Sequence, residues 1–127
     1  MPKGWTRSVK GSSVFFSDPS SSAYLQVDTT TQPKADALKD WKKQEPSLST
    51  RFAGYKKLRL EKIDYRGWNA ADWEFTWQSG RTIHVLNRNI RVNDSRAYAL
   101  LWSVPDSDWK ARKADFTAIA ATFQPAK

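Results

Sequence analysis

The residues best suited to acid–base chemistry lie close together in the middle of the chain. Asp72 and Glu74 precede the only histidine, His84, by twelve and ten residues. A carboxylate beside an imidazole can orient the ring or exchange a proton with it. Residues 70–78 alternate polar and aromatic side chains, which is the pattern of a strand with the two carboxylates on one face. Whether His84 can meet these acids therefore depends on how the next strand pairs.

Ser79-Gly80 follows this strand and predicts a two-residue hairpin loop, because glycine accepts the positive φ of a tight turn. That loop places Phe75 opposite His84, on the aromatic face and away from Asp72 and Glu74. His84 is then a packing residue. Glu74 is expected to form an ion pair with Arg59 of the preceding strand.

Composition leaves little support for catalysis. The 127 residues contain no cysteine, and we find no glycine-rich phosphate loop, metal-ligand cluster or nucleophile elbow. We therefore expect no enzymatic activity, no catalytic residue, no metal site and no cofactor. Lysine and arginine exceed the acids by 21 − 13 = 8, which favours anionic partners.

No apolar run is long enough to span a membrane, and we identify no signal peptide. If the parent protein is bound to a membrane, its anchor is expected to lie outside this chain.

The chain is expected to fold as one α+β domain over residues 1–127. Alternation and turn residues predict strands at 5–9, 14–17, 23–28, 55–65, 70–78, 81–92 and 96–104. One helix should begin near Pro33, carry an apolar stripe of Leu38, Trp41 and Leu48, and end or kink near Glu45 because Pro46 follows. A second helix should start after Pro105, and a bulge is expected near Glu61-Lys62.

The predicted sheet is an antiparallel meander with helices on both faces. Strand 96–104 is apolar on both sides, as expected for a strand that is covered on both faces. One face should carry Leu58, Leu60, Trp73, Phe75, Trp77, Leu86 and Leu101. The other should carry Ile83, Val85, Leu100, Trp102 and Val104.

A candidate ligand site follows from the order of the turns. In a meander the turns at 66–69 and 93–94 should emerge at the same end of the sheet. They would gather Arg66, Trp68, Arg91 and Arg96 at one rim. An aromatic plate beside guanidinium groups suits an anionic or planar ligand. The alternative is that Trp68 folds down as a lid on the core and the arginines are solvated.

Single-stranded nucleic acid is the alternative partner, because such binders combine basic grooves with aromatic stacking platforms. The residues that could supply one are Arg59, Arg66, Arg88, Arg91, Arg96, Trp68 and Tyr98. Against this interpretation, most aromatics occur at core spacing. The helix lysines Lys39, Lys42 and Lys43 also alternate with Asp36, Asp40 and Glu45, which indicates a solvated helix face.

Segment 65–75, Tyr-Arg-Gly-Trp-Asn-Ala-Ala-Asp-Trp-Glu-Phe, resembles the G-x-x-A-A-x-W-E-F signature of a family of extracytoplasmic domains. These domains occur at the C-terminal ends of actinobacterial, Streptomyces-type serine/threonine protein kinases and in related secreted or lipid-anchored proteins. Further matches are Pro2-x-Gly4-Trp5, Ala97-Tyr98-Ala99-Leu100 and Phe123-Gln124-Pro125.

The resemblance implies a PsbP-like α/β/α sandwich that acts as an extracytoplasmic sensor or interaction module, tethered to the membrane in the parent protein. The family has no agreed catalytic residues. It usually has a strand before the Pro-x-Gly-Trp segment. That strand is nearly absent here, so the opening edge strand is expected to be truncated.

Overall fold

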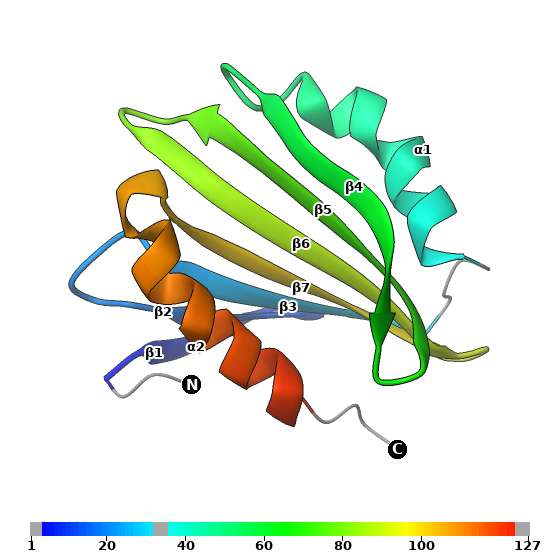
Figure 1. The fold of residues 1–127 in the computed structure, drawn as a ribbon. Coiled ribbons are helices and arrows are strands. Elements are labelled where there is room, and N and C mark those ends of the chain that lie inside the picture. The colour runs from blue at the N-terminus through cyan, green and yellow to red at the C-terminus, as the bar shows by residue number, and fades with distance from the viewer. Residues whose placement is uncertain (1–3, 32–35, 124–127) are drawn as a thin grey trace.

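The computed structural model describes residues 4–31 and 36–123 and shows one antiparallel sheet with a helix on each face (Figure 1). The strands are β1 (Thr6–Lys10), β2 (Ser13–Ser17), β3 (Tyr24–Thr30), β4 (Lys56–Tyr65), β5 (Trp68–Gln78), β6 (Thr82–Asn93) and β7 (Arg96–Pro105). The helices are α1 (Ala37–Ser49), the short 3-10 helix η1 (Asp106–Asp108) and α2 (Trp109–Thr122). The predicted α+β class is therefore confirmed.

The sheet combines two meanders. Its strand order is β1-β2-β3-β7-β6-β5-β4. The chain leaves β3, passes through α1 to the far edge, and returns strand by strand until β7 pairs with β3. The turns at 66–67 and 94–95 share one end of the sheet, and the turn at 79–81 lies at the other, as expected.

The two helices cover opposite faces of the sheet. On one face α1 packs on β4, β5 and β6; on the other α2 packs on β7. Figure 1 shows α1 behind the green strands and α2 in front of the opposite half. Two separate apolar cores result, one on each side of the sheet.

The aromatic face of β5 is the floor of the α1 core, as its alternation predicts. Trp73 and Phe75 are almost fully buried. Trp41 of α1 lies over Trp73, and Phe52 contacts Phe75 and Trp77, with ring centroids 4.9–5.9 Å apart. Aromatic pairs at these separations add stability beyond the area that they bury.

A hydrogen-bonded chain crosses this core. The indole of Trp73 donates to the Tyr55 hydroxyl at 2.8 Å, and that hydroxyl donates to Glu45 at 2.6 Å. Burial raises the pKa of Tyr55 to about 12, and the nearby Glu45 carboxylate adds to the shift. The hydroxyl is thus held in its donating form.

The predicted register of the β5–β6 hairpin was wrong by one residue. Gln78 pairs with Thr82, so the loop has three residues, 79–81, and Phe75 stands opposite Val85. A shift of one residue moves every side chain of a strand to the other face. Ile83 and Val85 therefore join the α1 core, and Leu86 joins the α2 core.

The β4 bulge also lies elsewhere than predicted. The pairing with β5 is irregular between Lys57 and Arg59, instead of at Glu61-Lys62. Leu58 is consequently 46% exposed and does not join the core as predicted.

Pro46 was predicted to end or kink α1 near Glu45. The helix does not end there, because it continues to Ser49. Beyond the proline, Leu48 packs against the α1 core. This contact offsets the lost backbone hydrogen bond. The helix begins after Asp36, whose carboxylate accepts from the backbone N–H of Lys39. Pro33 lies outside the described residues.

Asp18 anchors α2 to the β2–β3 connection. Its carboxylate accepts from the backbone and hydroxyl of Ser20, at 2.9 and 2.7 Å, and forms an ion pair with Arg112. These hydrogen bonds, those from Ser20 first, lower the pKa of Asp18 to about 2. Ionised Asp18 therefore stabilises the fold above the pKa of an unfolded aspartate, and this contribution is lost as the pH falls toward 2.

We predict that Asp18→Asn lowers the melting temperature at pH 7, because the substitution removes a carboxylate that the fold keeps ionised. The difference in melting temperature between the variant and the parent chain should shrink between about pH 4 and pH 2 and vanish below about pH 2. Thermal unfolding at pH 7, 4 and 2 measures this, with Asp64→Asn at an exposed position as the control. An offset that is equal at all three pH values would contradict the assignment.

Candidate functional site

The four residues predicted to form a rim site divide between the two faces of the sheet. Trp68 packs against the α2 core, and Arg66 reaches the C-terminal end of α2. Arg91 lies on the α1 side, where it lines a pocket beside the helix. The turns share an end of the sheet, but the side chains do not form one surface.

Arg66 and Trp68 fasten the end of α2. The Arg66 guanidinium donates to the carbonyl oxygens of Ala120 and Phe123, at 3.3 and 2.6 Å, and lies 4.7 Å from the Trp68 ring. The Trp68 ring in turn contacts Tyr65 and Phe123 edge-on. The carbonyls at a helix C-terminus lack partners within the helix, and a cation there is favourable. Both residues thus have a structural task.

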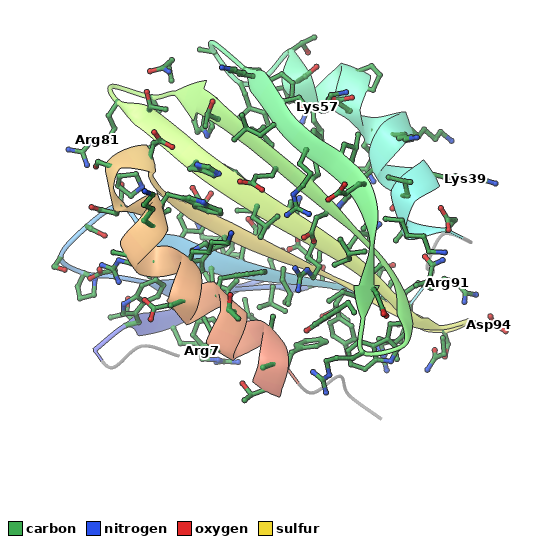
Figure 2. The ribbon with its side chains drawn as sticks, viewed as in Figure 1. Arg7, Lys39, Lys57, Arg81, Arg91 and Asp94 are labelled. Carbon is green, nitrogen blue, oxygen red and sulfur yellow. The ribbon has the colours of Figure 1, made fainter. Side chains whose placement is uncertain are left out.

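Arg91 and Arg96 lie beside the β6–β7 turn. Arg91 pairs with the exposed Asp94, and both side chains extend from the molecule at this end (Figure 2). Arg96 pairs in register with Asn93 across the turn. Alternation along β7 places Arg96 on the α2 side, the face opposite to that of Arg91.

A polar network that the sequence analysis missed covers part of the α2 side of β4, β5 and β6. Asp72 is 1% exposed, yet it accepts hydrogen bonds from Arg59 at 3.0 Å and from Arg88 at 2.7 and 3.0 Å. Arg59 also contacts Glu74 at 3.2 Å, which confirms the predicted ion pair. The buried carboxylate is balanced by two arginines, as a buried charge must be.

His84 belongs to this network, contrary to the prediction that it faces the aromatic residues. It stands opposite Thr76, so its ring lies on the same face as Glu74. Nε2 is 2.6 Å from Glu74, and Nδ1 is 2.9 Å from Asp106. The ring stacks on Trp109 with centroids 3.5 Å apart. Two carboxylates therefore bind one imidazole, an arrangement that joins the start of α2 to the sheet.

A polar pocket lies between α1 and β7. It measures about 360 Å³, with Asp40 and Gln44 on the helix side and Asn89 and Arg91 on β6. Small side chains such as Ala97 leave this space open. Asn89 is nearly buried, and its amide donates to Asp40 and to a helix carbonyl, both at 3.2 Å. Both N–H groups of the Asn89 amide are thus used within the fold, and the pocket can present the Arg91 guanidinium as a donor to the oxygen atoms of a small ligand.

Neither a metal centre nor a membrane span emerges from residues 4–31 and 36–123. Within them no group of histidines and carboxylates could hold a metal ion. None of the helices described there is long and apolar enough to cross a membrane.

Comparison with known families identifies the chain as a kinase-associated domain. It belongs to the family described as the serine/threonine kinase C-terminal domain, which matches residues 1–125. This match confirms the resemblance drawn from the Ala-Ala-x-Trp-Glu-Phe segment and its companions. No curated protein matches the chain.

Three solved structures share the fold. The cyanobacterial PsbP of Synechocystis sp. PCC 6803 has a TM-score of 0.73 at 19% identity, with 99% of this chain and 84% of that one covered. The protein PA94 of Pseudomonas aeruginosa is described as of unknown function and a putative regulator. It has a TM-score of 0.71 at 14% identity, and the match covers 100% of this chain and 90% of PA94. LpqN is described as involved in cell envelope biogenesis of Mycobacterium tuberculosis. It has a TM-score of 0.66 at 11% identity, and the match covers 95% of this chain and 78% of LpqN. The fold is therefore PsbP-like.

We predict that Trp68→Ala lowers the free energy of unfolding by about 1–3 kcal/mol, because it removes the ring that packs beneath Arg66 and against Phe123. Urea unfolding measures this change, with Val9→Ala, at a 54% exposed position, as the control. A variant as stable as the parent chain would show that Trp68 is free to serve a ligand.

Proposed function

We propose that this chain is a non-catalytic sensor or interaction domain that works outside the membrane, within a membrane-anchored serine/threonine protein kinase. The observation that carries this proposal is the family match over residues 1–125, which names a kinase C-terminal domain. The sequence lacks the phosphate-binding and catalytic motifs of the kinase itself. The chain thus supplies a function that the kinase domain does not.

An extracytoplasmic location is supported by the sequence resemblance and by one structural relative. LpqN, which has the same fold, is described as involved in cell envelope biogenesis. A domain displayed outside the membrane can bind a ligand while its kinase domain acts on the inner side.

The proposed partner is an anionic ligand or a protein outside the membrane. Of the four candidate residues, Arg91 is the best placed to meet a ligand, because it lines an open pocket. Arg66 and Trp68 already fasten α2, and Arg96 lies on the other face. The nucleic-acid alternative is weakened, because Arg59, Arg66 and Arg88 donate hydrogen bonds to groups of the protein itself.

The location can be tested by labelling intact cells of the source organism with an amine-reactive biotin reagent that does not cross membranes. We expect biotin on the exposed lysines Lys10, Lys110 and Lys113 of the parent protein. Labelling that occurs only after lysis would contradict an extracytoplasmic domain. A cytoplasmic enzyme of the same cells serves as the control for leakage.

We further predict that the isolated chain, mixed with Mg-ATP, neither hydrolyses ATP nor transfers phosphate to protein substrates above the buffer background. The buried acid–histidine cluster has its partners within the fold and no nucleotide-binding loop beside it. Turnover that His84→Ala or Glu74→Gln abolishes, in variants with an unchanged circular dichroism spectrum, would overturn the non-catalytic assignment.

A further inference from the structure

The charged residues of α1 are sorted by sign between its two sides. Lys39, Lys42 and Lys43 are exposed, whereas Asp40 and Glu45 are half-buried and face the sheet. Residues at positions i, i+3 and i+4 share one stripe of a helix. The outer stripe of α1 is therefore cationic, although the sequence alternates lysines with acids.

Each acid at this helix has a partner within the fold. Asp36 caps the helix and accepts from the Asn69 amide at 2.9 Å, which, with the cap hydrogen bond, lowers the pKa of Asp36. Asp40 accepts from Gln44 at 2.8 Å, besides its bond with Asn89.

Glu45, the third acid, accepts from Tyr55 and forms an ion pair with Lys57 at 3.3 Å. The acids thus have partners within the fold, and none of them forms an ion pair with Lys39, Lys42 or Lys43 in the described part of the chain; Lys57 is the lysine that Glu45 pairs with.

Edge strand β4 continues the cationic surface. Lys57 and Lys62 stand opposite Phe75 and Ala71, so they lie on the α1 side of the sheet. α1 packs directly on β4, and Figure 2 shows Lys39 and Lys57 on the same side of the molecule, away from α2. We call Lys39, Lys42, Lys43, Lys57 and Lys62 the lysine face.

The shape of this face limits its partner. α1 covers one face of the sheet (Figure 1). Its exposed lysines lie on the side of the helix turned away from the sheet, and the outside of a helix is convex because a helix is a cylinder. The pockets lined by Asn89, Arg88 and Tyr24 include no residue of the lysine face. Separate ammonium groups on a convex surface suit an extended anionic surface better than a single small anion.

An exposed leucine distinguishes lipid from a soluble polyanion. Leu58 lies between Lys57 and Arg59 at the β4 bulge and is 46% exposed; Val9 is the other large hydrophobic residue so exposed within the described segments. Lysines beside a protruding apolar residue are typical of surfaces that bind anionic membranes, because the leucine can enter the interface. A soluble polyanion gains nothing from it.

We propose that the lysine face, with Leu58, docks the domain on an anionic lipid surface. This inference extends the proposed function, since a domain tethered outside a membrane would then lie with α1 against it and with the α2 side directed away. Lysines near an anionic bilayer each contribute about 1 kcal/mol, and the attraction fades within a Debye length.

The test is co-sedimentation of the full chain with vesicles of phosphatidylglycerol and phosphatidylcholine, at about 50 mM salt. Pure phosphatidylcholine vesicles serve as the uncharged reference. A triple variant of the lysine face should bind the anionic vesicles about a hundredfold more weakly. It carries Lys39→Gln, Lys42→Gln and Lys43→Gln. The matched control is Lys10→Gln/Lys110→Gln/Lys113→Gln, which removes the same charge elsewhere and should change affinity less than threefold. Leu58→Ser should weaken binding, whereas Val9→Ser should not.

Three results would overturn the proposal. The first is that the chain does not bind the anionic vesicles. The second is that both triple variants lose the same affinity for them, which would reflect net charge alone. The third is an unchanged affinity of Leu58→Ser together with equally tight binding to soluble polyphosphate, which would identify a polyanion instead.

Failure of this inference and failure of the proposed function are distinguishable. Vesicle binding concerns the lysine face, whereas cell labelling concerns the location. If the domain is labelled on intact cells but does not bind anionic vesicles, the proposed function stands and only the proposed docking on lipid is wrong.

Discussion

The register of the β5–β6 hairpin determines which side chains meet each helix. Because Thr76 stands opposite His84, Trp73, Phe75 and Val85 share the α1 side. Glu74 and His84 share the α2 side. Each strand alternates faces, so this one pairing sorts the middle of the sheet into an aromatic side and a charged side. A helix must cover the aromatic side, and α1 does so.

The charged side is stabilised differently. Asp72 is buried beneath arginine side chains, and transfer of an unpaired carboxylate from water would cost several kcal/mol. Arg59 and Arg88 offset that cost, and His84 extends the network through Asp106 to the start of α2. Groups that resemble catalytic residues in the sequence therefore connect elements of the fold. The surfaces that we propose for partners are the pocket near Arg91 and the outer side of α1.

The sequence predicts the elements well because alternation and turn residues act locally. It identifies β5, the two-faced β7, the final helix and the family. The register could not be derived, since Ser79-Gly80 is compatible with loops of two or three residues and one residue reverses every face. The bulge at Leu58 and the helix beyond Pro46 depend on tertiary packing, as does the sorting of charges on α1. The four candidate rim residues lie on two faces, because a shared end of the sheet does not imply a shared face.

One measurement tests the hairpin register most directly. His84 is the only histidine, so its ring protons are identifiable in a proton NMR spectrum without further assignment. The account predicts nuclear Overhauser contacts from this ring to the indole of Trp109, on which it stacks. Contacts to the ring of Phe75 in their place would put His84 on the aromatic side and contradict the account.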